Sequence, residues 1–290
     1  MLLVLLSVLC SVTVSVIIKL ARRYSVNVVQ MIAWNYPVAV LLSYHYLKPD
    51  MSAFSLSEAP IISYVILGVL LPALFVIIAA SIRYTGIVRT EIAQRLSLFI
   101  PLLAAFLIFG EHPQALKLVG IGVGFAAIIC SIKWQQQSGS ALKNYIVIIN
   151  WFYFLLVFFG MGIIDILFKH IAQYQEVSYR TSIFIVFVLC TILSFLYIAY
   201  LAFARKMQFS LSGTLWGLVL GLFNFGNIIF YMKAHQALPD NPSMVFSAMN
   251  IGVIIVGALV GLLLFREKLS ALNKVGLLLA VVSVLIIGLL

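Results

Sequence analysis

The stretch "FGEHPQALKLVG" occupies residues 109–120, and "FREKLSALNKVG" occupies residues 265–276. Phe, Glu, Ala, Leu, Val and Gly recur at the same places in both stretches, 156 residues apart (265 against 109). Each stretch follows one long apolar run and precedes another. A phrase repeated in this way indicates two copies of one folding unit.

The composition favours a protein that folds in lipid. Of 290 residues, 64% are hydrophobic and 9% are charged, whereas an average soluble domain is about half apolar and about a quarter charged. A water-soluble fold of this size could not bury so much apolar surface, and disordered chains are poor in apolar residues. We therefore expect an integral, multi-pass membrane protein.

The formal net charge of +10 would suggest nucleic acid as a partner of a soluble protein. Here the basic residues stand between apolar runs rather than in one patch, so no nucleic-acid partner is expected. Cys10, Cys130 and Cys190 lie in separate apolar runs and are expected to be small buried hydrophobes. The spacing of Cys and His predicts neither a metal nor another cofactor.

Ten apolar runs are long enough to cross a bilayer, whose core of about 30 Å needs roughly 20 helical residues. Their length favours an all-α membrane protein over a barrel, whose strands alternate over about ten residues. The first run is read as a retained span, because its charges follow the apolar residues instead of preceding them. The predicted spans are 2–20, 28–47, 61–81, 91–110, 114–133, 146–168, 180–203, 213–234, 242–265 and 271–289.

The repeat extends beyond the opening phrase. "IIKLARRYS" (residues 17–25) aligns with "LFKHIAQYQ" (residues 167–175), and the polar segment "WQQQSGSALKN" (residues 134–144) lies between the halves. We expect two five-helix repeats, residues 1–138 and 139–290. Because five is odd, the second copy enters the membrane from the opposite side, which makes an inverted repeat of the kind frequent in transporters.

The basic residues also predict an orientation. Twelve Lys and Arg residues lie in or beside the links after odd-numbered spans, against five after even-numbered spans. Because short cytoplasmic loops carry an excess of Lys and Arg, this count places the first set of links in the cytoplasm and both termini outside.

The ten spans, the two halves and the Glu that is followed by Gly nine residues later, at Glu111 and again at Glu267, resemble the drug/metabolite transporter superfamily, in its EamA-type ten-helix branch. The resemblance covers essentially the whole chain. It implies a secondary transporter of the bacterial inner membrane that moves small metabolites through a cavity between the halves. It also implies cytoplasmic termini, the reverse of the charge count. Many relatives carry an Arg near the start of the second span, where this chain reads "VVQMIAWNYPV", so an anionic substrate is not inferred from that position.

Charged residues inside the spans are candidate substrate or proton sites, because they are costly in lipid and face the protein interior. Glu91 and Arg95 are four residues apart, so they share a helix face and can pair. Asp165 stands four residues before Lys169. A membrane carboxylate of this kind can bind and release a proton, and a salt bridge at the membrane edge is the competing interpretation.

Amides and one tyrosine complete the candidate site. Gln94 and Asn250 correspond at the offset of 156, which suits a cavity on a pseudo-two-fold axis. Interhelical hydrogen bonds would explain both amides equally well. Asn224, Asn227 and Tyr231 recur at i, i+3 and i+7 and should share one helix face.

Two further candidates, Asn35 and Tyr36, interrupt the second span next to Pro37. Pro72 and Pro101 also lie within predicted spans, all three in the first half. Since proline removes a backbone donor and can kink a helix, we expect the first half to bend more during transport.

The repeated residues of the opening phrase are read as scaffold. Glu111 and Glu267 stand at helix starts, where a carboxylate interacts well with the helix dipole and with free N–H groups. Gly120 and Gly276 are expected to allow close packing between helices.

The function predicted from these features is a proton- or gradient-coupled exporter of small metabolites, such as amino acids, that works by alternating access. An intramembrane enzyme is one alternative, but no HExxH motif or Ser/His arrangement supports catalysis, so no enzyme is expected. A channel or membrane scaffold is another. The expected partners are a small-molecule substrate and the lipid bilayer, and a homodimer is left open.

Overall fold

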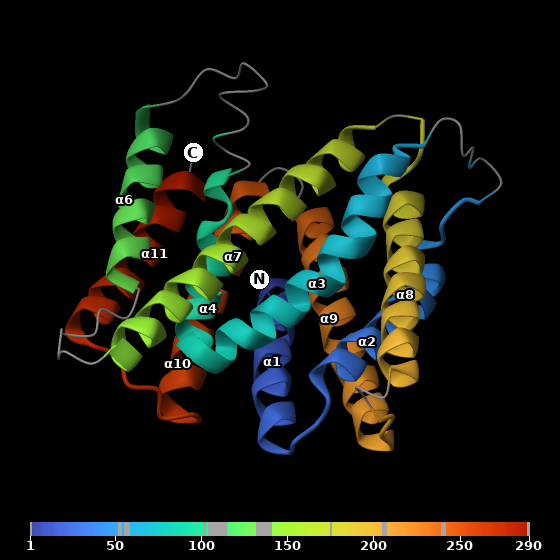
Figure 1. The fold of residues 1–290 in the computed structure, drawn as a ribbon. Coiled ribbons are helices and arrows are strands. Elements are labelled where there is room, and N and C mark those ends of the chain that lie inside the picture. The colour runs from blue at the N-terminus through green and yellow to red at the C-terminus, as the bar shows by residue number, and fades with distance from the viewer. Residues whose placement is uncertain are drawn as a thin grey trace.

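The computed structural model describes residues 2–51, 54, 59–100, 103, 115–131, 141–174, 176–204, 208–238 and 242–288. In these ranges every regular element is a helix (Figure 1). The helices are α1 (Leu2–Arg23), α2 (Val28–Leu47), α3 (Ile61–Thr85), α4 (Ile87–Leu96), α6 (Ala115–Ser131), α7 (Ala141–Gln173), α8 (Tyr179–Phe203), α9 (Leu211–Ala237), α10 (Pro242–Leu263) and α11 (Ala271–Gly288).

The helices fall on the predicted spans, which confirms the all-α fold class. Helix α7 extends five residues beyond its predicted span at each end, and α4 begins at Ile87, whereas its span was predicted from residue 91. The chain passes from α3 into α4 through Gly86 alone, whose φ of 90° is a backbone conformation that glycine adopts without steric cost. The remainder of that predicted span falls largely on residues 101–102 and 104–114, outside the described part of the chain.

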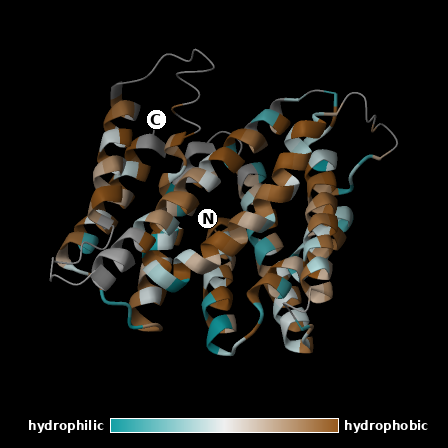
Figure 2. Ribbon diagram, viewed as in Figure 1, coloured by the Kyte–Doolittle hydropathy of each residue, from teal (hydrophilic) through white to brown (hydrophobic). Residues whose placement is uncertain are grey.

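The outer surface of the bundle suits lipid. Five of the described helices are long and apolar enough to cross a membrane: α1, α3, α8, most of α9 and the part of α7 from Trp151 to Ala172. Figure 2 shows hydrophobic colouring along the helices and hydrophilic colouring mainly at their ends and links. Large apolar side chains such as Ile62, Leu196 and Leu278 are mostly exposed. The protein is therefore an integral, multi-pass membrane protein.

The packing of the helices has the pattern of an inverted repeat (Figure 1). Helix α1 packs against α9, and its counterpart α7 packs against α3. The contact between α2 and α9 is matched by that between α8 and α3, and α1 with α10 is matched by α7 with α4. Counterparts also meet directly, as α4 with α10 and α6 with α11 do. These contacts either have a partner or join two counterparts under exchange of the halves, as a pseudo-two-fold axis requires.

The division into residues 1–138 and 139–290 remains a prediction, because the seam lies outside the described residues. Pro37 and Pro72 lie inside α2 and α3, while Pro101 is not among the described residues. The greater bending of the first half also remains a prediction. Of the three cysteines, Cys190 is buried, as expected, whereas Cys10 and Cys130 are half-buried.

Helices α2 and α9 approach closely along a row of glycines. A Cβ atom on Gly217 would lie 2.5 Å from the carbonyl oxygen of Met31 and 2.5 Å from Cβ of Trp34. One turn further along α9, a Cβ on Gly221 would lie 2.6 Å from Cβ of Val38. Small residues at four-residue intervals let membrane helices approach in this way, which gives dispersion contacts between their backbones.

We expect Gly217→Ala to lower the thermal stability of the detergent-solubilised protein, by about 1–3 kcal/mol, because the methyl group has no room in this interface. Gly122→Ala is the matched control, since a Cβ at Gly122 of α6 would meet no atom of the described residues within 4 Å. The control should be neutral or slightly stabilising, because alanine is the better helix former. Equal melting temperatures for the Gly217 variant and the wild type would contradict the packing argument.

Candidate functional site

A stripe of polar side chains runs along the face of α1 that looks into the bundle. Ser7, Ser11, Ser15 and Lys19 follow one another at four-residue intervals, so they lie on one side of the helix and extend over about 18 Å at about 1.5 Å per residue. The three serines are buried. Each of the four side chains bonds to a different residue outside α1. Two of these residues belong to α4 of the first half and two belong to the second half.

The middle of this stripe holds the Glu91–Arg95 pair of α4. The Ser15 hydroxyl donates to Oε1 of Glu91 at 2.5 Å, and Nη2 of Arg95 donates to the Ser11 hydroxyl at 2.9 Å. Nη2 of Arg95 also lies 3.8 Å from Oε2 of Glu91. The predicted pairing of Glu91 with Arg95 is therefore confirmed.

Two polar atoms of the Glu91–Arg95 pair lack a hydrogen-bond partner in the described part of the chain. Oε2 of Glu91 and Nε of Arg95 are buried and make no hydrogen bond within the described part of the chain. Buried polar atoms without partners are uncommon and costly. Helix α10 comes close at Gly257, where a Cβ would lie 3.1 Å from Cγ of Glu91. Oε2 of Glu91 and Nε of Arg95 are thus enclosed between the two halves.

Asp165 of α7 joins the same charged group. Its carboxylate interacts electrostatically with Arg95, consistent with the packing of α7 against α4. Tyr231 of α9 lies close to both of these charged groups. Among the described residues no hydrogen bond or ion pair involves the Asp165 side chain. The side chain of Lys169, its predicted partner, lies outside the described part.

The residues of the predicted stripe on α9 bond to two different neighbouring helices. Nδ2 of Asn224 donates to Oδ1 of Asn35 on α2 at 3.1 Å. The Ser7 hydroxyl of α1 donates to Oδ1 of Asn227 at 2.8 Å. Asn224 and Asn35 therefore join α2 to α9, whereas Asn227 and Tyr231 lie nearer the charged group on α1, α4 and α7.

The remaining candidates lie on helices around the same centre. Gln94 is half-buried on α4 and Asn250 is buried on α10, and these two helices pack against each other. The amides are thus on symmetry-related, adjacent helices, as the offset of 156 predicts. Tyr36 is buried on α2 and meets Phe75 of α3 edge-on, with ring centroids 6.4 Å apart. The packing of Tyr36 separates it from the charged group.

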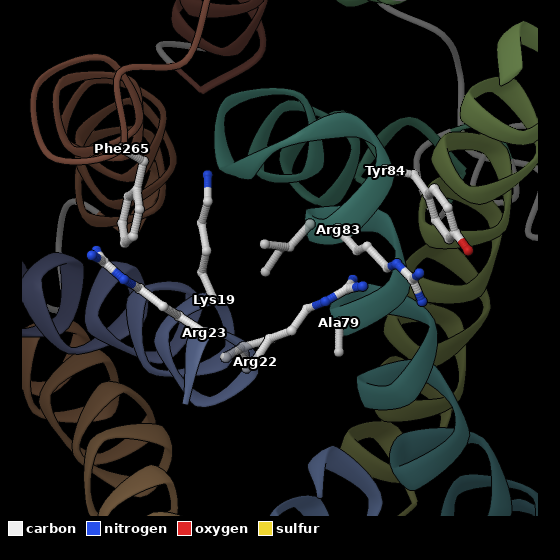
Figure 3. Close-up of a pocket in the computed structure, with 9 residues that line it drawn as sticks. Lys19, Arg22, Arg23, Ala79, Arg83, Tyr84 and Phe265 are labelled. Atoms are coloured by element: carbon white, nitrogen blue, oxygen red, sulfur yellow. The ribbon is translucent and has the colours of Figure 1, made fainter. Parts of the chain in front are cut away.

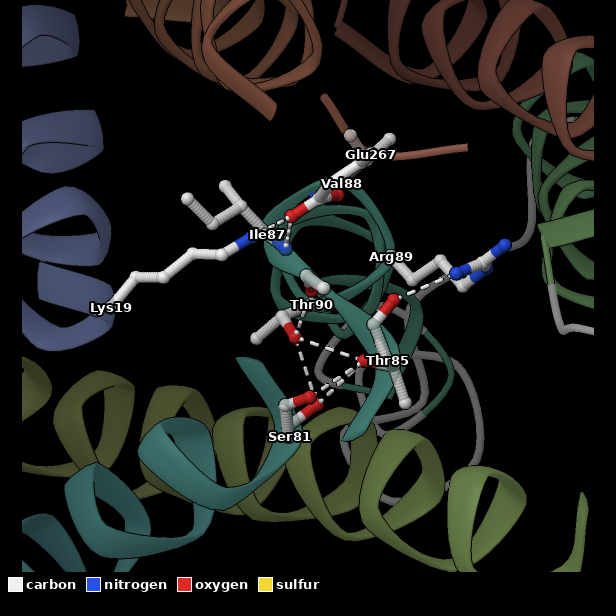
Figure 4. A network of polar contacts seen from close by, with 9 residues as sticks. Lys19, Ser81, Thr85, Ile87, Val88, Arg89, Thr90 and Glu267 are labelled. Atoms are coloured by element: carbon white, nitrogen blue, oxygen red, sulfur yellow. Dashed lines mark hydrogen bonds and ion pairs between the residues drawn. The ribbon is translucent and has the colours of Figure 1, made fainter. Parts of the chain in front are cut away.

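Glu267 closes one end of the stripe (Figure 4). Its Oε1 accepts from Nζ of Lys19 at 2.5 Å and from the amide of Ile87 at 2.7 Å. Its Oε2 accepts from the amide of Val88 at 3.3 Å. The expected capping role is therefore confirmed for Glu267, but the capped helix is α4 of the other half rather than the following helix, α11. Glu111 lies outside the described residues.

The break between α3 and α4 is held by hydroxyl groups beside this cap (Figure 4). The hydroxyls of Ser81 and Thr90 are 2.9 Å apart, and that of Thr85 donates to the Ser81 carbonyl at 2.9 Å. Arg89 donates to the Thr85 carbonyl at 2.8 Å and to Oδ1 of Asn273, on α11, at 2.7 Å. This end of the bundle, which we call the Glu267 end, is thus tied across both halves.

Sequence reasoning missed the serines of α1, Lys19 as a site residue, and the reach of Glu267 to α4. The four-residue spacing of "SVLCSVTVSVIIK" (residues 7–19) is a signal that could have identified the stripe. Within the described ranges, no group of three or more His, Cys, Asp or Glu side chains is placed to hold a metal ion.

Two comparisons with known proteins agree with this architecture. Residues 1–133 match the family model described as the EamA-like transporter family. The chain is also 41% identical over 279 residues to a protein of Haemophilus influenzae that is named only as an uncharacterized protein, and the similarity covers 93% of this chain and 91% of that protein. The chain therefore belongs to the EamA-like transporter family, within the drug/metabolite transporter superfamily.

Proposed function

We propose that the protein is a proton-coupled secondary transporter of the bacterial inner membrane that exports small zwitterionic metabolites, amino acids among them, by alternating access. Membership of a family of transporters favours this function over an intramembrane enzyme. The bacterial origin of the Haemophilus influenzae relative supports the inner membrane. The substrate class, the coupling ion and the direction of transport are the parts that the experiments below address.

The observation that carries the proposal is the group formed by Glu91, Arg95 and Asp165. A charged side chain at the centre of a membrane helix costs at least about 2.5–3.5 kcal/mol, so three such groups together favour a functional site. The group contains both signs. The carboxylate of a zwitterion would pair with Arg95 and its ammonium group with Asp165, and the unpaired Nε of Arg95 is a suitable donor.

The two carboxylates differ in how closely their partners hold them, and this difference supports proton coupling. Glu91 is held by Ser15 and Arg95, whereas Asp165 interacts with Arg95 only at longer range. Two carboxylates that share one arginine carry a surplus negative charge, which either a proton or a substrate ammonium group can neutralise. Competition between the two for Asp165 would couple export of the metabolite to entry of a proton.

The arrangement of the halves supports alternating access. The Lys19–Glu267 ion pair and the cap on α4 join the halves at one end of the α1 stripe. Breaking these bonds would open that end while the charged group remains between the halves. A pathway that opens at one end at a time is typical of transporters built from inverted repeats.

Transport by purified protein in liposomes tests the proposal. A panel of labelled amino acids and related zwitterions is added with and without a pH gradient, and we expect pH-driven flux of at least one of them. The proposal fails if no solute moves, or if ion currents far above transporter turnover show a channel.

Asp165→Asn is expected to reduce pH-driven flux by at least about tenfold, because the amide neither ionises nor neutralises Arg95. Glu176→Gln is the matched control, since Glu176 is exposed in the link between α7 and α8 and should leave flux unchanged. Wild-type flux in the Asp165 variant would exclude this carboxylate as the coupling group, whichever solute is transported.

A further inference from the structure

The Glu267 end holds a basic pocket whose lining includes none of Glu91, Arg95 and Asp165. A cavity of about 490 Å³ lies between the last turns of α1 and α3 (Figure 3). Four basic side chains line it, Lys19, Arg22, Arg23 and Arg83, and Tyr84 and Phe265 form aromatic walls. This volume lies within the range of about 300–1,000 Å³ that is typical of ligand pockets.

Among the described residues, the basic side chains at this pocket outnumber the acidic ones. Glu267 neutralises Lys19, the side chain that points toward it in Figure 4. In the described part of the chain no carboxylate pairs with Arg22, Arg23 or Arg83. The Arg83 guanidinium instead lies 4.9 Å from the centroid of the Tyr84 ring. Three guanidinium groups therefore surround one hollow without an acidic partner.

Two of these guanidinium groups converge. Arg22 of α1 and Arg83 of α3 extend toward the same part of the cavity in Figure 3, and both line it. Like charges at short range repel each other. An anion between them would replace this repulsion by two attractions, and the planar guanidinium forks match the oxygens of a phosphate group.

The ordinary roles of basic residues at helix ends explain only part of this arrangement. Cations in the last turn of α1 interact favourably with the helix dipole, and they help to set orientation. Basic side chains that extend separately into water would provide both effects. Neither effect requires that Arg22 and Arg83 converge on one hollow from different helices.

The depth of the pocket indicates how an anion would reach it. The apolar spans of α1 and α3 end at Arg23 and Thr85, so the guanidinium groups lie near the level where lipid headgroups meet the hydrocarbon core. Ile18 and Ile82 also line the pocket and provide apolar contact beneath the charges. Basic pockets between membrane helices at this depth are suited to anionic lipid headgroups.

We propose that this pocket is a phosphate-binding site, and that its occupant is the headgroup phosphate of an anionic phospholipid bridged by Arg22 and Arg83. The site is separate from the charged group on α4 and α7. It joins α1 to α3 at the end of the bundle that the Lys19–Glu267 ion pair also holds. Bound lipid therefore stabilises the arrangement in which this end is closed.

Thermal unfolding of the purified protein in a neutral detergent tests this site. Phosphatidylglycerol is titrated against phosphatidylcholine, and the wild type is expected to gain roughly 5 °C more from the anionic lipid at saturation. In Arg22→Gln/Arg83→Gln the apparent affinity for phosphatidylglycerol should fall at least tenfold. Arg180→Gln is the control, because Arg180 is exposed at the start of α8, the opposite end of the bundle, where Tyr64 of α3 meets Ser182.

A parallel titration with inorganic phosphate identifies the source of the anion. If phosphate gives the same arginine-dependent gain as the lipid, the site is confirmed and its ligand is a soluble anion. If the double variant keeps the full lipid effect, or Arg180→Gln loses as much, the effect is diffuse attraction and the proposal is overturned. No gain from either anion also overturns it. Should the double variant not survive purification, Arg22→Gln and Arg83→Gln singly decide the matter, because a bridging anion needs both side chains.

Discussion

Replacing Arg95 by glutamine is expected to abolish transport and to destabilise the protein by about 3–5 kcal/mol, the usual cost of removing one partner of a buried ion pair. Glu91 and Asp165 would then be two carboxylates inside the bundle that have lost the arginine they share. Ser11 would also lose the hydrogen bond that it accepts from Nη2 of Arg95. Thermal unfolding and flux in liposomes measure the two effects separately.

The variant Glu91→Gln/Arg95→Gln separates the stability of this pair from its role in transport. Removing both charges leaves one carboxylate without its arginine, that of Asp165, instead of two, so the double variant should be more stable than Arg95→Gln but less stable than the wild type. Flux should nevertheless remain absent, because a zwitterion would find no cation. Normal flux in this double variant would show that the pair only supports the fold. Arg180→Gln is the control, and its flux is expected to be normal.

Glu267→Ala has the second-largest expected effect, a loss of about 2–4 kcal/mol. The carboxylate satisfies two amides at the start of α4 and pairs with Lys19, and a lost cap alone costs about 0.5–2 kcal/mol. Gly86→Ala should also destabilise the protein, because Gly86 lies on the α4 side of the same contact. A Cβ at Gly86 would lie 2.6 Å from Oε2 of Glu267, and its φ of 90° is unfavourable for alanine.

A double-mutant cycle between Lys19→Gln and Glu267→Gln isolates the ion pair from the cap. Because glutamine still presents an oxygen to the amides of α4, Glu267→Gln should cost less than Glu267→Ala, and the coupling between the two Gln substitutions should be positive. Lys268→Gln, at the exposed neighbouring position, should leave the melting temperature unchanged. A Glu267→Ala protein as stable as the wild type would show that α4 needs no cap from the other half.

Much of the fold follows from hydropathy alone, because lipid requires long apolar helices. The predicted span 28–47 coincides with α2 at both ends, and α3 begins at Ile61, where the next span was predicted to begin. The prediction failed where charge interrupts hydropathy. Residues 87–90 were placed outside the predicted span, yet they belong to α4. Arg89 is buried there and bonds to Asn273 and to the Thr85 carbonyl.

The site is predictable only in part. Charges inside apolar runs identify Glu91, Arg95 and Asp165, since such groups are costly unless they serve a purpose. Serines carry no such signal, because a hydroxyl can bond to its own helix, and the role of Ser15 depends on its neighbour in space. The contact of Glu267 with Ile87 joins residues 180 positions apart, and no local pattern specifies that distance.

The cap that Glu267 places on α4 has a consequence for biogenesis. The ribosome delivers the start of α4 into the membrane long before residue 267 has been synthesised, so the amides of Ile87 and Val88 await their acceptor while most of the second half is translated. The contacts of α1 with α9 and of α3 with α7 are postponed in the same way. Insertion of the early helices and their final assembly are thus separate events, and the nascent first half depends on the last link of the chain for its completion.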